Sequence, residues 1–314
     1  MSHTPLLIAK QLNRHFAQHH AVNNLSFELS RGEVLGFLGP NGAGKSTTMR
    51  MLTGNLAPSA GSITINGIDL LEQPAEAKAH LGYLPEQPPL YRELTINEYL
   101  IFCAQLHRVP ENKISVAIDE TLQRCGLTDN CHRLIGNLSK GYQQRVGIAQ
   151  AIVHNPSIVI LDEPTVGLDP IQIRDIRQLI RELGEDHAVI LSTHILPEVQ
   201  ATCSRVQIIN EGQLVFSESI QGLEKRLTKN VLTLETAKPM DNEMLQAIPH
   251  IKQVNRVSDT RAELSWETTN PADAISLLVA EKGWGLQELA LSRRSLEQVF
   301  VELTCNDNQT KAAT

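Results

Sequence analysis

One nine-residue stretch combines the residue types that bind nucleotide phosphates: Gly39-Pro40-Asn41-Gly42-Ala43-Gly44-Lys45-Ser46-Thr47. Glycines without a Cβ let backbone N–H groups approach an oxyanion, and a helix N-terminus would add partial positive charge at the same point. Lys45 would bring a full charge to the β- and γ-phosphates, and the Ser46 hydroxyl would coordinate Mg²⁺. An apolar run at residues 33–38 predicts a strand before the loop, and residues 47–52 predict a helix after it. This strand-loop-helix context favours a phosphate-binding loop over an incidental glycine-rich turn.

Two adjacent carboxylates, Asp162 and Glu163, end a continuous apolar run at residues 157–161. Such a run predicts a central parallel strand that is buried on both faces. Because side chains alternate along a strand, the two carboxylates point in different directions, so one can help to hold Mg²⁺ while the other activates water. An isolated Asp-Glu pair could instead lie in a solvated turn. The apolar strand before the pair and the phosphate loop elsewhere in the chain disfavour that alternative.

A second apolar run, residues 188–193, delivers His194 at its end in the same way. The alternative is a structural histidine held by hydrogen bonds. Phe16 is the only aromatic residue in the polar stretch 13–20, and it would either stack on an adenine ring or anchor a loop.

The length and composition of the chain exclude several classes of protein. With 314 residues, of which 41% are hydrophobic, the chain can form two domains. Its apolar runs are shorter than the roughly 18 to 20 residues of a membrane span, and its first residues lack a signal peptide, so we expect a cytosolic chain without an intrinsic span. Five scattered cysteines without a C-x-x-C pair suggest neither zinc nor disulfides. A net charge of -7 argues against a nucleic-acid partner.

The elements around the motifs follow from periodicity and turn signals. Residues 5–32 predict a small antiparallel sheet, and a turn at Asn66-Gly67 predicts a hairpin. A capping box at residues 95–98 begins a helix that runs to about residue 107, and a second helix covers about residues 113–125. These helices belong to a helical insertion at about residues 88–155.

With these residues identified, the chain resembles the nucleotide-binding subunits of ABC transporters over residues 5 to about 220. The decisive segment is Leu138-Ser139-Lys140-Gly141-Tyr142-Gln143-Gln144-Arg145, which looks like the signature motif of that family. The order of the motifs also matches: phosphate loop, Gln loop, signature, carboxylate strand, the loop 167–169, and the switch histidine. The resemblance implies a P-loop NTPase cassette of the α/β class, with a parallel core sheet, an antiparallel β subdomain and a helical insertion.

The resemblance also implies a role for each residue. Residues 39–47 would hold the phosphates and Mg²⁺, Phe16 would lie under adenine, and Asp162 would bind the metal. Glu163 would be the general base, and His194 would contact the γ-phosphate. Ser139 and Gly141 would cap the γ-phosphate held by a partner chain, and Asp169 would link the two sites.

Departures from the family pattern lie at three places, and one of them is Phe16, which replaces the more usual Tyr. Lys140 and Tyr142 stand where the family commonly has Gly and Gln. The usual loop glutamine position holds Glu86, with Gln87 one residue later. We take Gln87 as the candidate metal ligand, with Glu86 as the alternative.

In the family two cassettes pair head to tail, which implies a homodimer here because the chain has one copy of each motif. An integral-membrane permease would be the partner, and the cassette would lie on the cytoplasmic face of the membrane. The runner-up is a soluble ABC-type ATPase acting on ribosomes or DNA. It is disfavoured because the chain shows neither a second cassette nor long coiled coils. A P-loop kinase would leave residues 139–143 without a role.

The remaining chain, residues 221–304, predicts a separate accessory or regulatory domain. Strand and helix patterns there occur in the order βαββαβ, which is typical of a ferredoxin-like α+β unit. An amphipathic helix at 295–303 and a disordered tail at 305–314 would follow. This ending resembles the cassette subunits of exporters whose permeases are separately encoded, so export is the expected direction.

Overall fold

The computed structural model describes residues 4–293, apart from the side chains of residues 224–229 and 292–293. The helix predicted at 295–303 and the tail predicted at 305–314 therefore lie outside the described residues. The chain divides into two compact units, and the division falls between Ile220 and Gln221. Each unit is described by itself below.

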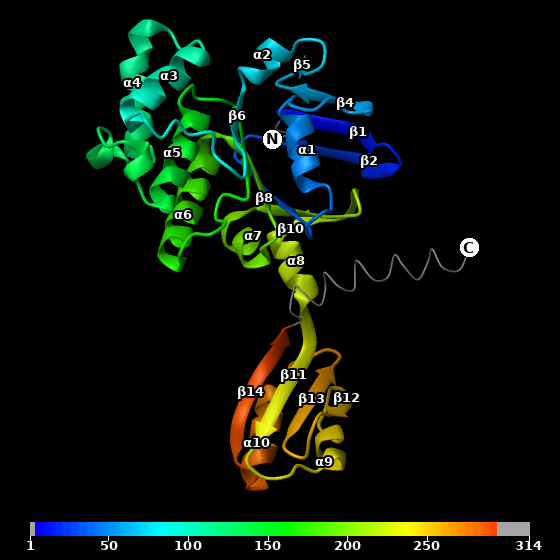
Figure 1. The fold of residues 1–314 in the computed structure, drawn as a ribbon. Helices are drawn as coiled ribbons and strands as arrows, with labels where there is room; N and C mark the ends of the chain where they lie inside the picture. The colour runs from blue at the N-terminus through cyan, green and yellow to red at the C-terminus, as the bar shows by residue number, and fades with distance from the viewer. Residues whose placement is uncertain (1–3, 294–314) are drawn as a thin grey trace. The chain divides into compact units, whose positions relative to one another are not determined.

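The first unit is built on a six-stranded sheet in the order β10-β9-β3-β8-β7-β6 (Figure 1). Its strands are β3 (Val34–Leu38), β6 (Leu81–Leu84), β7 (Ile158–Asp162), β8 (Ala188–Thr193), β9 (Arg205–Asn210) and β10 (Gln213–Ser219). All neighbours pair in parallel except β9 and β10. Every residue of β3, β7 and β8 is buried, as continuous apolar runs predict for strands covered on both faces.

Alternate residues of β7 enter two different hydrophobic clusters. Val159 and Leu161 pack with the helices of the predicted insertion, whereas Ile158 and Ile160 pack with the N-terminal sheet and α1 (Lys45–Leu52). The parallel sheet thus separates two apolar layers. The predicted cassette architecture, with a parallel core, an antiparallel subdomain and a helical region, is confirmed.

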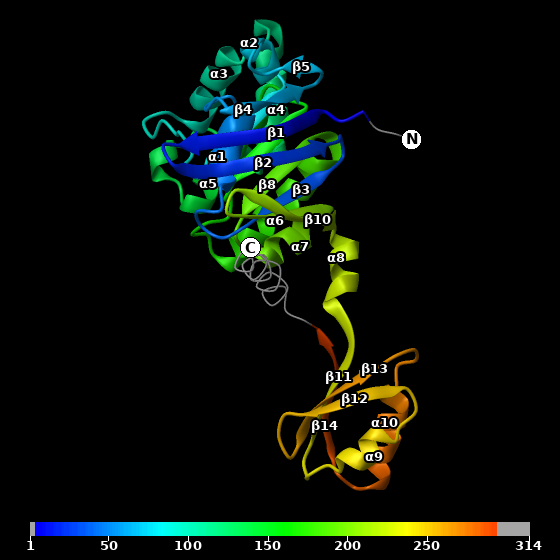
Figure 2. The ribbon, with the colours of Figure 1, turned by 90° about the vertical axis from the view of Figure 1, so that its right-hand side faces the viewer.

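The antiparallel subdomain is a four-stranded sheet in the order β2-β1-β4-β5 (Figure 2). Its strands are β1 (Leu7–Phe16), β2 (His19–Leu29), β4 (Ala60–Ile65) and β5 (Ile68–Asp69). β1 extends into the polar residues of the stretch 13–20. They stay in the strand because β1 pairs with β2 as far as Phe16 and His19, and only two residues form the turn.

The helical region contains α3 (Ile96–Leu106), α4 (Glu111–Arg124) and α5 (Lys140–Ile152). The predicted capping box begins α3: the Thr95 hydroxyl accepts a hydrogen bond from the Glu98 N–H, and the Glu98 carboxylate accepts one from the Thr95 N–H. The remaining helices of this unit are α2 (Pro74–Lys78), α6 (Pro170–Asp186) and α7 (Leu196–Thr202), and α8 (Ile220–Leu227) begins at the unit's last residue. Within the described residues, no helix has the length and apolar character needed to cross a membrane.

The second unit has the predicted order βαββαβ. It consists of β11 (Thr228–Thr236), α9 (Asn242–Gln246), β12 (Ile251–Arg256), β13 (Arg261–Trp266), α10 (Ala272–Glu281) and β14 (Leu286–Arg293). The sheet order is β12-β13-β11-β14, and every pairing is antiparallel. Leu232, Leu234 and Leu264 of the sheet pack against Ile275 and other apolar residues of the two helices.

A half-buried histidine just after α5 ties this helix to the sheet. His154 Nε2–H donates to the Leu81 carbonyl over 3.0 Å, and its ring stacks on His107 with centroids 3.7 Å apart. Its Nδ1 is buried and has no hydrogen-bond partner among the described residues. Burial, followed by the neighbouring His107, lowers the pKa of His154 from 6.5 to about 4. A second proton would therefore enter a site that offers it no acceptor.

We expect acid to destabilise the protein through this histidine. Because the folded pKa lies below the unfolded one, its contribution to stability is complete above about pH 6.5 and is lost as the pH falls toward 4. Between pH 7 and pH 5 the free energy of unfolding should fall by about 2 kcal/mol more in the wild type than in His154→Gln. Urea unfolding followed by circular dichroism measures this difference; tryptophan fluorescence would not, because Trp266 and Trp284 both lie in the second unit. Exposed His132→Gln is the control, and equal acid sensitivity of His154→Gln and wild type would contradict the prediction.

Candidate nucleotide site

The phosphate loop connects β3 to α1, whose first residue is Lys45. Gly42 and Gly44 have φ angles of +82° and +100°, which favour glycine strongly. A Cβ on Gly44 would lie 2.3 Å from the Ala21 carbonyl oxygen. The loop therefore needs glycine for backbone conformation and for space, and its N–H groups meet the start of a helix as an anion site requires.

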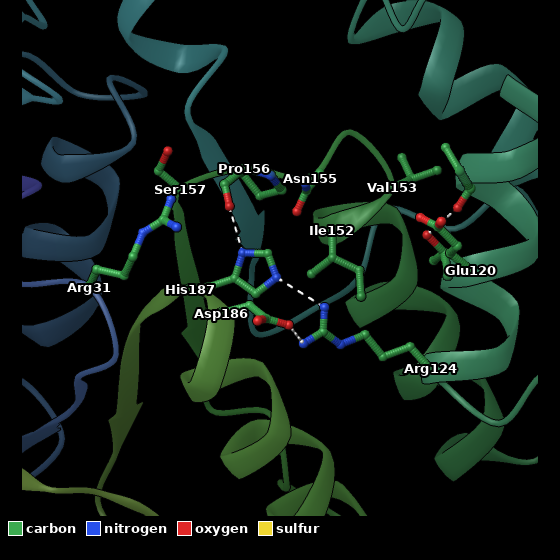
Figure 3. A pocket seen from close by; sticks show the side chains of 12 residues that line it. Arg31, Glu120, Arg124, Ile152, Val153, Asn155, Pro156, Ser157, Asp186 and His187 are labelled. Atoms are coloured by element: carbon green, nitrogen blue, oxygen red, sulfur yellow. Dashed lines mark hydrogen bonds and ion pairs between the residues drawn. The ribbon is translucent and has the colours of Figure 1, made fainter. Parts of the chain in front are cut away.

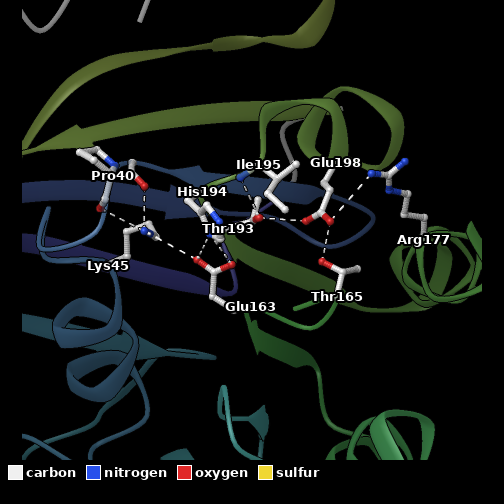
Figure 4. A network of polar contacts seen from close by, with 10 residues as sticks. Pro40, Lys45, Glu163, Thr165, Arg177, Thr193, His194, Ile195 and Glu198 are labelled. Carbon is white, nitrogen blue, oxygen red and sulfur yellow. Dashed lines mark hydrogen bonds and ion pairs between the residues drawn. The ribbon is translucent and has the colours of Figure 1, made fainter. Parts of the chain in front are cut away.

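Lys45 is buried at the base of this loop, with 6% of its surface exposed. Its Nζ donates to the carbonyl oxygens of Gly39 (2.7 Å) and Pro40 (3.2 Å) and lies 3.7 Å from Glu163 Oε1 (Figure 4). Burial lowers the pKa of Lys45, and the carboxylates of Glu163 and Asp162 oppose that shift. The ammonium group is therefore held by the carbonyl groups of the loop, for which a bound phosphate would compete.

Asp162 ends β7 and is 3% exposed. Its Oδ1 makes no hydrogen bond to any described residue. Burial raises the pKa of Asp162, and the hydroxyls of Ser192 and Ser46 oppose the shift. A buried carboxylate oxygen without a partner, beside a serine hydroxyl, fits a hard divalent cation such as Mg²⁺, which prefers oxygen ligands.

Glu163 follows directly, just outside β7, and contacts Lys45 and His194. Both of its carboxylate oxygens lie 3.0 Å from His194 Nδ1. Its backbone is left-handed, with a φ of +50°, and its N–H donates to the Ser192 carbonyl over 2.9 Å. Glu163 and His194 are 31 residues apart in sequence. The parallel pairing of β7 with β8 brings the ends of these two strands, and so the two side chains, together. A carboxylate held this way can accept a proton from water.

Most of these groups line a pocket of about 510 Å³, although Asp162 is not among its lining residues in the described part of the chain. The predicted residues Phe16, Glu163, His194 and most of the phosphate loop line it, together with His19, Ala21, Glu86 and Val166. Phe16 is 43% exposed, and the Arg14 guanidinium lies 4.7 Å from its ring centroid. The volume and the mixture of ring, loop and carboxylate suit a nucleotide.

Comparison with known proteins identifies the family. The family model described as ABC transporter matches residues 22–166. The uncharacterized ABC transporter ATP-binding protein YxlF of Bacillus subtilis (strain 168) is 32% identical over 298 residues, which cover 95% of this chain and 99% of YxlF. The chain belongs to the ABC transporter family. It is an ATP-binding subunit with the ATPase activity of that family.

Two further relatives support the same assignment. The bacitracin transport ATP-binding protein BcrA of Bacillus licheniformis is 33% identical over 299 residues, covering 93% of this chain and 95% of BcrA. A solved structure of an ATP binding subunit of an ABC transporter is 31% identical with a TM-score of 0.64, over 70% of this chain and 92% of that one. YxlF and BcrA thus match over both units of this chain, and the solved structure over most of it.

The signature of this ABC subunit lies outside the pocket. Ser139 caps α5 by accepting a hydrogen bond from the Tyr142 N–H (3.5 Å). A Cβ on Gly141 would lie 2.6 Å from the Gln172 side chain, so the signature packs closely on the start of α6. Asp169 caps α6 through the N–H groups of Ile171 and Gln172. Neither Ser139, Gly141 nor Asp169 is among the described residues that line the pocket.

The Gln-loop position differs from our candidate ligand. Among the described residues Glu86 lines the pocket, whereas Gln87 does not. β6 ends at Leu84, and Glu86 follows two residues later. The carboxylate of Glu86 is near enough to influence the pKa values of Lys45 and Asp162. His19, an exposed residue, also lines the pocket, because it pairs with Phe16 at the end of β1.

A second hollow of about 360 Å³ lies at the opposite, amino ends of β7 and β8 (Figure 3). His187 Nδ1 lies 2.6 Å from the Pro156 carbonyl, and its Nε2 lies 3.4 Å from Arg124 Nη1. Arg124 also forms an ion pair with Asp186 at 2.6 Å. These polar groups satisfy one another, so the hollow is a structural junction between α4, α6 and the strand that follows Pro156.

Proposed function

We propose that this subunit hydrolyses Mg²⁺-bound ATP as one half of a head-to-tail homodimer and so drives export through a separate membrane permease. The observation that carries the proposal is that some motifs of the chain line the pocket while the signature motif does not. The pocket gathers the phosphate loop, Glu163 and His194, whereas Ser139 and Gly141 lie outside it. A second copy of the chain would bring its signature to the open side of the pocket and complete the site.

Within the site each residue has one task. Ser46 and Asp162 would hold Mg²⁺, which would neutralise charge on the phosphates. Lys45 would exchange its carbonyl contacts for phosphate oxygens. Glu163 would take the proton from the attacking water, and His194, 3.0 Å away, would fix the carboxylate and contact the γ-phosphate. Loss of the γ-phosphate would remove the bridge between the two chains.

Dimer closure would be the mechanical step. Moving a two-state element from mostly open to mostly closed needs about 5.5 kcal/mol of differential binding, which two ATP molecules could share equally. Export is supported by the relatives, since BcrA is named for bacitracin transport and another 31% identical relative for linearmycin resistance. The second unit, which YxlF shares, would have an accessory or regulatory task.

The permease would dock on the segment that joins the pocket to the helical region. Glu86 lines the pocket, and α3 begins at Ile96 only ten residues later. Tyr91 lies between them, 47% exposed, with its ring against Tyr99 and Phe102 of α3. A shift of Glu86 on nucleotide binding would therefore reach the surface of α3 through a short, packed connection.

Charge reversal at Arg92 or Glu93, both exposed, should uncouple hydrolysis from transport. Neither side chain lines the pocket, so ATPase activity of the isolated protein should stay within about twofold of wild type, while transport in membranes with the co-purified permease should fall at least about tenfold. Charge reversal at exposed Glu120, on α4, is the control. Equal losses of ATPase activity and transport, or unchanged transport, would show that this segment is not the docking surface.

A further inference from the structure

Glu198, in α7, is a buried carboxylate that no sequence motif singles out, with only 1% of its surface exposed. Its Oε1 accepts a hydrogen bond from Thr165 Oγ1 over 2.5 Å, and its Oε2 accepts one from Thr193 Oγ1 over 2.9 Å (Figure 4). Arg177 Nη2 of α6 lies 3.8 Å from Oε1. One carboxylate therefore joins three elements: the loop after β7, the end of β8, and α6.

The two threonines are next to the reacting groups in sequence. Thr165 follows Glu163 by two residues, and Thr193 immediately precedes His194. A backbone hydrogen bond from the Glu163 N–H to the Ser192 carbonyl also links these two loops. Glu198 thus holds both loops from behind, while the Glu163–His194 contact joins them at the pocket.

This support is needed because Glu163 has an uncommon backbone conformation. A left-handed residue other than glycine costs about 1 kcal/mol or more and persists only where its surroundings hold it. Thr193 Oγ1 also accepts from the Ile195 N–H over 3.1 Å, so its own hydrogen is directed to Glu198. Burying a carboxylate is itself costly unless it is paired, and here both oxygens are.

We propose that Glu198 is a positioning residue for hydrolysis: it sets the distance between Glu163 and His194 by bonding the threonine beside each. The proposal rests on the proposed roles of Glu163 and His194. It assigns Glu198 no contact with nucleotide. Loss of the two hydrogen bonds between Glu198 and the threonines should therefore slow hydrolysis. Nucleotide binding, which depends on the phosphate loop, should be unchanged.

Glu198→Gln tests this directly, because the amide keeps the size but replaces one acceptor oxygen by a donor. One threonine hydroxyl then loses its acceptor. We expect kcat to fall on the order of 10- to 100-fold, as small displacements in a catalytic pair do, with ADP affinity and the KM for ATP within about twofold. Rates and calorimetric ADP binding would be measured well below the melting temperature of each variant. Exposed Glu185→Gln, which removes the same charge from α6, should change neither quantity.

Thr193→Val and Thr193→Ser provide a second test, which is needed if Glu198→Gln folds poorly. Valine has the shape of threonine without the hydroxyl, so it should lower kcat to a similar extent, and combining it with Glu198→Gln should add little further loss. Serine keeps the hydroxyl and should restore most of the rate. A residue that only stabilises the fold would lower kcat and ADP affinity together, and the double variant would be additive.

Three results would overturn the proposal: a kcat of Glu198→Gln within twofold of wild type, parallel losses of kcat and ADP affinity, or equal rates for the serine and valine variants. Glu163→Gln and His194→Ala distinguish this failure from failure of the proposed function. Where those two variants are inactive and Glu198→Gln is normal, only the positioning role is wrong. Where they are active, the roles on which it rests are wrong.

Discussion

Glu163→Gln should bind ATP and almost cease to hydrolyse it. The amide has nearly the same shape as the carboxylate but cannot take a proton from water, and loss of a general base costs on the order of 10²- to 10⁴-fold in rate. The substitution also removes the negative charge that lies 3.7 Å from Lys45 Nζ, so affinity for the anionic nucleotide should not fall. Phosphate release and calorimetric ATP binding measure the two effects.

The same variant should accumulate as a dimer in ATP, because closure would no longer be followed by hydrolysis. Size-exclusion chromatography with and without ATP shows this as a shift in elution volume. Glu185→Gln, on the exposed face of α6, is the matched control and should behave as wild type. Phosphate release near the normal rate would assign the base to another residue, and a monomer in ATP would argue against the closing step.

Lys45→Ala and Ser139→Arg should each abolish ATPase activity, and mixing the two variant proteins should restore part of it. Lys45 contacts nucleotide held by its own chain, whereas Ser139, at the start of α5, lies outside that pocket. In a head-to-tail heterodimer, one site combines both substitutions and the other has neither. A one-to-one mixture should therefore recover up to about a quarter of the wild-type rate, since half of the dimers are mixed and each has one intact site.

The controls are Lys45→Ala alone and Ser139→Arg alone, each at the total protein concentration of the mixture. Activity no greater than the sum of the separate variants would contradict the head-to-tail arrangement, provided that chromatography shows the mixed dimer forming in ATP. That contradiction holds only if a cross-link between Ser139→Cys of one chain and Ser46→Cys of the other also fails to form in ATP, because a cross-linked but inactive mixed dimer would mean that the two sites act only together.

Elements with local signals are predicted well from the sequence. The Thr95–Glu98 capping box involves residues three apart, and the structure begins α3 there. The βαββαβ order of the second unit follows from periodicities of 2 and 3.6, and the structure has that order. The extent of β1 does not follow in this way, because its polar outer residues resemble a loop until β2 pairs with them.

The sequence alone predicted which residues would bind phosphate and metal and in what order, because the phosphate loop, the carboxylate strand and the signature each place their chemistry within a few residues. Tertiary structure decided which distant residues meet. It brought Glu86 rather than Gln87 to the pocket and stacked His107 on His154. It also placed Glu198 behind Glu163 and His194, although in sequence it is one more glutamate on a helix. Local patterns encode backbone conformation and burial, whereas a partner 30 or more residues away depends on how the sheet and helices pack.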